Sequence, residues 1–205
     1  MEKYQFFESI RLKDGQFDLL DFHETRLRRT QHLFYGEISK AFSLFDFLHQ
    51  FPFPQKGLFK CRLQFGENLA EPEFIPYQKR KIQSIKLIRN DEINYDFKST
   101  NRQSINELIE QKGDFDDVLI IRNGLITDTS FCNIVFRKEN EWFTPEKPLL
   151  AGVRRASLLE KGMIKTAKID LEMLQKFESF KLINAMITWE EAEEHKVEAL
   201  RLRSG

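Results

Sequence analysis

Net charge is the first thing this chain lacks. Its 205 residues include 32 Lys plus Arg and 32 Asp plus Glu, so the formal charge is zero. Proteins whose main partner is nucleic acid or an anionic membrane usually carry a basic excess. The balance therefore argues against both partners and predicts a mixed, solvated surface.

Cysteine and long apolar runs are also scarce. The two cysteines, Cys61 and Cys132, are too few for a disulfide framework, and neither they nor the four histidines show metal-ligand spacing. No run approaches the length that spans a bilayer. Residues 1–8 are not followed by the apolar segment of a signal peptide. We therefore expect a cytoplasmic protein without a metal site, in a reducing compartment.

Phenylalanine, by contrast, is abundant, with 20 residues. Many of these rings must lie in a core, because so much aromatic area in water invites association. Apolar residues make up 41% and charged residues 31%, as in an ordinary soluble globular protein. The length allows one or two small domains.

The first half of the chain predicts two domains joined by a linker. The expected strands are Tyr4–Leu12, Gln16–Leu20, Gly57–Phe65 and Glu73–Ile75. Asp21 is a good N-cap for a helix that Gly36 is placed to end, and a second helix is expected over Ser43–Gln50. Pro76–Lys81 is polar, charged and led by proline, which predicts a boundary between domains 1–80 and 81–205. The alternative is a surface loop within one domain.

The second half alternates short strands and helices. The expected strands are Ile82–Ile88, Val118–Arg122, Leu125–Asp128, Asn133–Phe136, Trp142–Pro145, Ile164–Ile169 and Phe180–Thr188. The expected helices are one capped by Ser99 or Thr100 and closed at Gly113, one over Val153–Lys161, and a short one from Asp170 to Phe177. The charged tail from Glu190 onwards is expected to be frayed or lightly helical.

Four residues offer chemistry that belongs together. Lys98 is an amine nucleophile if it is desolvated, and otherwise a surface lysine. Asp128 follows a strand and is suited to pair with a protonated pyridine nitrogen, or it is a turn residue. Gly152 heads a helix whose first N–H groups suit a phosphate, and Arg26 offers a bidentate fork. Each alone also has the plain structural interpretation.

Taken in order and spacing, these motifs resemble a known family. The motifs are Lys98-Ser-Thr-Asn-Arg102, Asp117-Val-Leu-Ile-Ile121, Asn123-Gly-Leu-Ile-Thr-Asp-Thr-Ser130, Asn133-Ile-Val-Phe136, Phe143-Thr-Pro145 and Leu150-Ala-Gly-Val-Arg-Arg155. They are similar to those of the class IV aminotransferases, the fold-type IV pyridoxal-phosphate enzymes. Phe7–Gly15 and Leu20–Leu27 resemble the family's first strand and its His-x-x-Arg-Leu helix.

The resemblance implies a fold and a cofactor. We expect an α/β (α+β) protein of fold type IV, with a small N-terminal α/β domain and a larger C-terminal domain that has a β-barrel-like sheet. It implies pyridoxal 5'-phosphate as cofactor, a small-molecule amino substrate and a homodimer. The chain begins close to the family's first strand, without its usual leading segment, which is expected to expose part of the site or of the dimer surface.

The resemblance also implies a role for each site residue. Lys98 matches the lysine that binds the cofactor covalently and moves the proton. Asp128, where the family normally has Glu, would pair with the pyridine nitrogen, and Thr129 beside it would bind the cofactor. Arg102 lies near the position where many transaminases carry a Tyr by the cofactor's phenolic oxygen.

Three further residues are implied for the phosphate. Arg26 matches the phosphate-binding arginine of the first helix. Val153 and Arg154 match the two residues whose backbone amides hold the phosphate, with Arg154 in place of a usual Thr. Asn133 matches a scaffold asparagine of the family, and no chemical role is implied for it.

The reaction that the resemblance favours is that of 4-amino-4-deoxychorismate lyase, a step of folate biosynthesis that releases pyruvate and gives 4-aminobenzoate. Asn101-Arg102, the compact length and Ile183–Met186 point to it. The first alternative is an aminotransferase acting on branched-chain or D-amino acids. The second is an inactive cofactor-binding or structural relative, suggested by Asp128, Arg154 and the short N-terminus.

Overall fold

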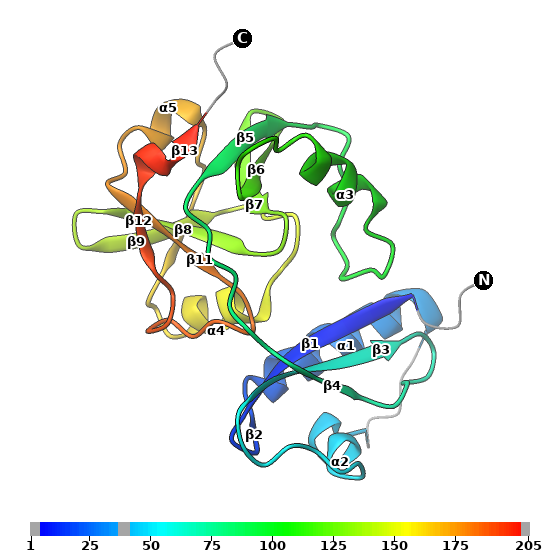
Figure 1. Cartoon of the computed structure of the whole chain (residues 1–205). Helices are drawn as coiled ribbons and strands as arrows, with labels where there is room; N and C mark the ends of the chain where they lie inside the picture. The colour runs from blue at the N-terminus through cyan, green and yellow to red at the C-terminus, as the bar shows by residue number, and fades with distance from the viewer. Residues whose placement is uncertain (1–4, 37–41, 202–205) are drawn as a thin grey trace. The chain divides into compact units, whose positions relative to one another are not determined.

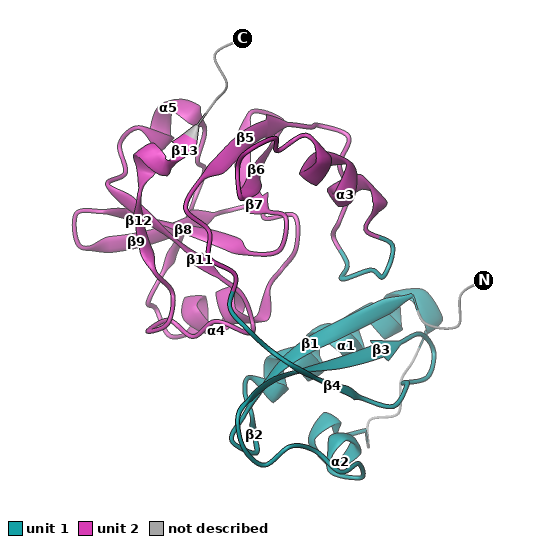
Figure 2. Ribbon diagram, viewed as in Figure 1, with its two compact units in different colours: residues 1–79, 97–101 teal, residues 80–96, 102–205 magenta. Residues whose placement is uncertain are grey.

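The computed structural model describes residues 5–36 and 42–201, and it divides into two compact units (Figures 1 and 2). Unit 1 consists of Met1–Lys79 and Phe97–Asn101, and unit 2 of Arg80–Asp96 and Arg102–Gly205. The chain first passes from one unit to the other after Lys79, inside the predicted linker. A second segment of unit 1 then interrupts the predicted 81–205 domain.

That second segment carries Lys98, which the domain prediction placed in the larger domain. The backbone N–H of Phe7 donates to the carbonyl of Lys98 at 3.0 Å, and that of Thr100 donates to the carbonyl of Gln5 at 2.8 Å. Ser99 forms an isolated antiparallel bridge with Phe6. The segment therefore belongs to unit 1 because it pairs with an open edge of the first strand.

Unit 1 is a four-stranded antiparallel sheet in the order β2-β1-β3-β4. Its strands are β1 (Phe6–Lys13), β2 (Gln16–Phe17), β3 (Leu58–Phe65) and β4 (Glu73–Pro76), and its helices are α1 (Leu20–Tyr35) and α2 (Leu44–Leu48). Ile10 of β1 and Leu27 of α1 lie in one buried core, together with side chains of α2 and β3. Because side chains alternate along a strand, Glu8 lies on the same face of β1 as Ile10.

Helix α1 begins one residue before its predicted N-cap. Asp21 lies within the first turn, and the N-cap position is Leu19, whose φ of 56° is left-handed. The carboxylate of Asp21 still favours the helix, because negative charge near the N-terminus complements the helix dipole. Gly36, with φ 90°, ends the helix as predicted and donates its N–H to the carbonyl of His32.

Unit 2 is built on a nine-stranded mixed sheet, with the path β10-β9-β8-β7-β6-β5-β13, and with β11 pairing with β8 and β12. Its strands are β5 (Ile85–Arg89), β6 (Asp117–Arg122), β7 (Leu125–Thr129), β8 (Asn133–Lys138), β9 (Glu141–Pro145), β10 (Lys165–Ala167), β11 (Ser179–Ile183), β12 (Glu194–Lys196) and β13 (Leu200–Arg201). Its helices are α3 (Gln103–Glu110), α4 (Val153–Glu160), α5 (Leu171–Leu174) and the 3-10 turn η1 (Val197–Ala199). The path does not close among the described strands, so the domain is β-rich but open where a barrel-like sheet was expected.

Two further expectations about unit 2 were wrong. Ser99 and Thr100 do not cap α3, because both hydroxyls donate to the carbonyl of Gln5, and the N-cap position is Arg102. The predicted strand Phe180–Thr188 ends at Ile183, where Asn184 starts a turn by accepting the N–H of Met186 at 2.9 Å.

The tail also differs from the prediction, because it pairs with the sheet instead of fraying. Strand β12 lies antiparallel to β11, and β13 lies parallel to β5. The edges of β5 and β11 offer unpaired backbone groups, and adding a strand satisfies them. Residues 202–205 of the predicted tail lie outside the described residues.

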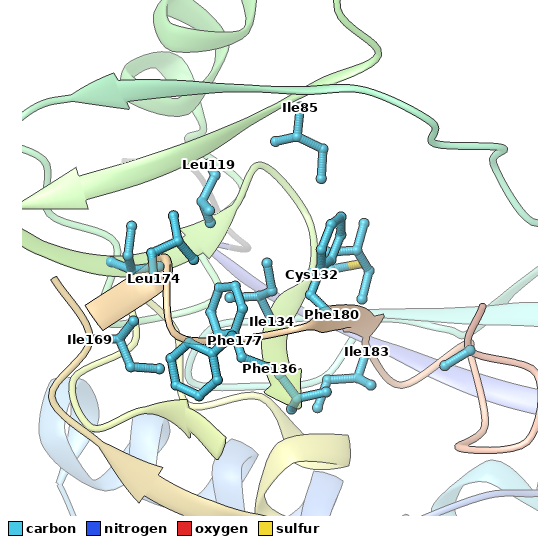
Figure 3. Close-up of a cluster of buried hydrophobic side chains, with 14 of the residues drawn as sticks. Ile85, Leu119, Cys132, Ile134, Phe136, Ile169, Leu174, Phe177, Phe180 and Ile183 are labelled. Atoms are coloured by element: carbon cyan, nitrogen blue, oxygen red, sulfur yellow. The ribbon is translucent and has the colours of Figure 1, made fainter. Parts of the chain in front are cut away.

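The core of unit 2 contains part of the large phenylalanine content (Figure 3). Phe136, Phe177 and Phe180 are buried, and the ring centroid of Phe136 lies 5.2 Å from that of Phe177 and 6.4 Å from that of Phe180. Not every phenylalanine is in a core, since Phe34 and Phe45 are 49% and 54% exposed.

Replacing Phe136 with Ala should destabilise the protein by about 3–5 kcal/mol, because the change leaves a cavity in a close-packed aromatic cluster. Denaturant unfolding followed by circular dichroism measures the loss. Met163→Ala, at a position 40% exposed on the same unit, is the control and should change the unfolding free energy by less than about 0.5 kcal/mol. Equal effects of the two changes would contradict this account of the core.

Candidate functional site

The predicted site residues fall into two groups, one in each unit. Arg26 and Lys98 belong to unit 1, whereas Arg102, Asp128, Thr129, Val153 and Arg154 belong to unit 2. Each group is described within its own unit. We call Glu8, His23, Arg26 and Lys98 the unit 1 cluster, and Asp128, Asn133, Leu150 and Gly152 the unit 2 cluster.

The centre of the unit 1 cluster is a fully buried carboxylate. Arg26 donates from Nε to Oε1 of Glu8 at 2.8 Å and from Nη2 to Oε2. The Nδ1 of His23 lies 2.7 Å from the same Oε2. Glu8 comes from β1, whereas Arg26 and His23 lie one turn apart on α1, so the three side chains join the helix to the sheet.

The pKa values of Glu8 and His23 are both lowered in this cluster, but for different reasons. Burial raises the pKa of Glu8, but the charge of Arg26 and the hydrogen bonds from Arg26 and His23 outweigh it and bring the pKa to about 2. Burial lowers the pKa of His23 more than Glu8 raises it. At neutral pH the carboxylate is therefore ionised and the imidazole neutral, so Nδ1 carries the hydrogen that Glu8 accepts.

Lys98 is held beside this cluster by the pairing of its backbone with β1. Its Nζ lies 4.6 Å from the centroid of the Phe7 ring, within the range of a cation–π interaction. Its charge also contributes to lowering the pKa of His23. The structure therefore brings Lys98 and Arg26, two of the predicted site residues, into one neighbourhood of unit 1.

The unit 2 cluster is also built on a buried carboxylate. Asp128 is the residue before last in β7 and pairs with Asn133, the first residue of β8. Its Oδ1 accepts from Nδ2 of Asn133 at 2.8 Å, and its Oδ2 accepts the backbone N–H of Leu150 at 2.9 Å. Burial raises the pKa of Asp128 to about 6, although these hydrogen bonds and the charge of Arg155 act in the opposite direction.

Asn133 extends the same network to the turn before α4. Its Nδ2 also donates to the carbonyl of Leu150 at 2.9 Å. A Cβ at Gly152 would lie 2.0 Å from Oδ1 of Asn133, so only glycine fits there. One amide therefore holds Asp128 and the start of α4 together.

The start of α4 has the geometry of an anion site. Gly152 is the N-cap and provides no side-chain cap, and the first intrahelical bond runs from Ala156 to the carbonyl of Gly152 at 2.9 Å. The N–H groups of Val153 and Arg154 lie ahead of that bond, at the positive end of the helix dipole. Backbone groups in this position are suited to hold a phosphate.

Arg102 and Thr129 lie near the end of β7. Arg102 donates from Nη2 to the carbonyl of Ser130 at 2.7 Å, and its Cζ lies 5.5 Å from the centroid of the Tyr95 ring. The hydroxyl of Thr129 accepts the N–H of Cys132 at 3.1 Å and so closes the 129–132 turn. The structure thus brings Arg102, Asp128 and Thr129 to one end of this strand.

Three residues that contact the predicted site residues or the elements carrying them were not predicted from the sequence. Glu8 was visible only as an acid inside an apolar strand, and His23 as a histidine one turn from Arg26. Arg155 is buried and donates to the carbonyl of Pro145 at 2.8 Å, which ties the end of β9 to α4. Neither a cluster of metal-ligating side chains nor a helix able to cross a membrane occurs within residues 5–36 and 42–201.

The comparisons with known proteins decide the family. The model for amino-transferase class IV matches residues 67–191. This chain belongs to the class IV aminotransferases. A class IV aminotransferase is an enzyme of mixed α/β fold that uses pyridoxal phosphate, and this holds for the present protein.

Relatives of this class IV aminotransferase support the assignment. It is 34% identical over 185 residues to an "Uncharacterized protein" of Haemophilus influenzae, covering 89% of this chain and 98% of that one. The crystal structure of a "putative 4-amino-4-deoxychorismate lyase" from Haemophilus somnus 129PT is 34% identical, with a TM-score of 0.83 over 91% of this chain and 98% of that chain.

A more distant structure shows the same fold. A "putative amino-acid aminotransferase" from Mesorhizobium loti has 19% identity and a TM-score of 0.78, over 97% of this chain and 99% of that chain.

The residues of unit 2 fit the cofactor of this family. A pyridine nitrogen that stays protonated needs a carboxylate, and Asp128 is a buried one with both oxygens already oriented. A phosphate needs close approach to backbone N–H groups, and Gly152 leaves no Cβ in the way. Within unit 2, Val153 and Arg154 are the residues that would hold the phosphate.

Changing Gly152 to Ala should weaken pyridoxal phosphate binding at least about tenfold, or about 1.4 kcal/mol, because the new Cβ collides with Oδ1 of Asn133. Titration of the cofactor-free protein, followed by absorbance, measures the affinity. In the Asn133→Ala background, Gly152→Ala should weaken binding little further than Asn133→Ala alone, since the colliding atom is gone. Additive losses would contradict the proposed contact.

Asp128 should also leave a pH signature in the cofactor-free protein. Its folded pKa of about 6 exceeds the ordinary value of 3.8, so its contribution to stability is greatest at low pH and is lost as the pH rises through 6. The unfolding free energy of the wild type minus that of Asp128→Asn should therefore fall by on the order of 3 kcal/mol between pH 4 and pH 7. Urea unfolding across this range measures it, and a constant difference would contradict the raised pKa.

Proposed function

We propose that this enzyme is a 4-amino-4-deoxychorismate lyase, which releases pyruvate from its substrate and leaves 4-aminobenzoate. The observation that carries the proposal is the similarity to the Haemophilus somnus structure, at 34% identity over nearly the whole of both chains. That protein carries the name "putative 4-amino-4-deoxychorismate lyase". Within the present chain, Asn101-Arg102 supports the same activity, because a lysine followed by this pair resembles some lyase members.

The position of Arg102 fits this proposal. Its guanidinium donates to the carbonyl of Ser130, two residues after Asp128, and in the sequence Arg102 lies near the position where many transaminases carry a tyrosine. An arginine keeps its positive charge at every working pH. We propose that Arg102 lies by the cofactor's phenolic oxygen and favours negative charge on that oxygen. The tyrosine of a transaminase would instead offer a phenol proton that can be exchanged.

The proposed roles of the other residues follow from their chemistry. When bound, the cofactor would withdraw electrons from the carbon that carries the substrate's amino group. Lys98 would then accept the proton of that carbon on its Nζ. Asp128 would remain ionised to pair with the ring nitrogen, with Thr129 beside it. Arg26, Val153 and Arg154 would hold the phosphate.

The proposal extends to the surroundings of the enzyme. We propose that its partners are a small-molecule amino substrate and a second copy of the same chain, in a homodimer. We also propose a cytoplasmic location, which is supported by Cys61 and Cys132 being buried as thiols and not joined in a disulfide.

The direct test supplies purified protein with 4-amino-4-deoxychorismate. We expect pyruvate, detected by coupling to lactate dehydrogenase, and equimolar 4-aminobenzoate, detected by mass spectrometry. Lys98→Ala should lower the rate by about 100-fold to 10,000-fold, the range for loss of an acid–base group. Lys168→Ala, an exposed lysine of unit 2, is the matched control and should leave the rate unchanged.

Two other outcomes would replace the proposal. Rapid transfer of an amino group from a branched-chain or D-amino acid to 2-oxoglutarate, without pyruvate release, would make the protein an aminotransferase. Binding of the cofactor with neither activity would make it an inactive relative.

A further inference from the structure

A buried anion lies beneath the predicted phosphate-binding arginine. Glu8 has no exposed surface, whereas the side chain of Arg26 is 14% exposed. The guanidinium is therefore bound from the interior side and reaches toward the surface of unit 1. Burying a carboxylate in this way is unfavourable unless it is paired and hydrogen-bonded, so the arrangement calls for an explanation beyond packing.

The bonds fix the orientation of the guanidinium. Arg26 donates to both oxygens of Glu8, through Nε and Nη2. This bidentate geometry holds the plane of the fork, and it uses two of the five N–H donors of an arginine. The orientation of the guanidinium as a whole is consequently defined by Glu8.

His23 in turn fixes Glu8. Its Nδ1 lies 2.7 Å from Oε2, the oxygen that Nη2 of Arg26 also contacts. The carboxylate is thus bound from two sides and cannot rotate without losing a hydrogen bond. Because burial keeps the imidazole neutral, His23 supplies the hydrogen bond without a charge that would compete with Arg26.

The surroundings of this pair are apolar or cationic. Ile10 and Leu27 are completely buried in the same core, so the low-polarity environment strengthens the bonds to Glu8. The charged groups that face His23 are Glu8 from β1, Arg26 from α1 and Lys98 from the paired segment. Arg26 and Lys98 are thus two cationic side chains near one buried carboxylate, and cationic side chains of this kind bind phosphate.

We propose that Glu8 and His23 are positioning residues, which orient the guanidinium of Arg26 toward the phosphate of the cofactor. The inference rests on Arg26 being a phosphate ligand, which the family resemblance implies. It is separate from the choice between lyase and aminotransferase, because both reactions use the same cofactor. Neither residue touches the reacting atoms in this proposal.

The test compares two probes that differ only in the phosphate. The full chain is stripped of cofactor and titrated with pyridoxal phosphate or with pyridoxal, and binding is followed by absorbance. Glu8→Gln should weaken the binding of pyridoxal phosphate by about tenfold, in line with the loss of a charge-assisted pair. The same change should alter the binding of pyridoxal by less than about twofold, because pyridoxal lacks the phosphate that Arg26 is proposed to bind.

A double-mutant cycle identifies the route of the effect. If Glu8 acts through Arg26, then Glu8→Gln should add nothing to the loss caused by Arg26→Ala. Equal losses for the two probes would show that Glu8 only supports the fold and would overturn the proposal. It would also be overturned if Arg26→Ala left pyridoxal phosphate binding unchanged.

Substitutions at His23 provide a second route if Glu8→Gln does not fold. Asn places an amide nitrogen close to the position of Nδ1, so His23→Asn should bind pyridoxal phosphate within about threefold of the wild type. His23→Leu should resemble Glu8→Gln. Equal binding by the two variants would overturn the role of His23. Pyruvate release at saturating cofactor is measured in parallel, so that failure of the lyase assignment is seen independently.

Discussion

The need to satisfy a buried carboxylate organises the functional end of unit 2. Asp128 has 4% of its surface exposed, and every other residue of β7 except Leu125 is buried as well. Its two oxygens accept from Asn133 and from the backbone of Leu150. These two bonds determine where the loop before α4 lies, because a loop displaced from Asp128 would leave an unpaired buried acceptor. The position of the anion site at Gly152 follows from this constraint.

Two of the buried acids, Glu8 and Asp128, show how the partners of a carboxylate decide its ionisation. Burial raises the pKa of both, but Glu8 ends at about 2 and Asp128 at about 6. Glu8 has a guanidinium in direct contact with both oxygens, whereas Asp128 has neutral donors and only the more distant charge of Arg155. A carboxylate without a cation of its own is suited to receive one from a ligand, and a protonated pyridine ring supplies it. The same reasoning is consistent with the proposed roles, in which Glu8 supports Arg26 and Asp128 contacts the cofactor.

Much of the architecture could be predicted from local patterns. The strands of the central region, Val118–Arg122 and Asn133–Phe136, appear where the apolar runs indicated them, and Gly36 ends its helix as expected. The errors occurred where local preference competed with longer-range pairing. Ser99 and Thr100 are good helix caps, but they bond to Gln5, and the charged tail pairs with the edges of β5 and β11. Neither partner is visible in a window of neighbouring residues.

The sequence by itself determined the family and the residue types on which the chemistry depends. The order and spacing of the motifs between Lys98 and Arg155 carried that prediction, because together they resemble one family, whereas each motif alone is weak. Only the tertiary structure decided what holds them. It showed Glu8 and His23 behind Arg26, Asn133 between Asp128 and Gly152, and Lys98 attached to the first strand. Most of these hydrogen bonds join residues 15 or more positions apart along the chain, so they depend on distances that only folding sets.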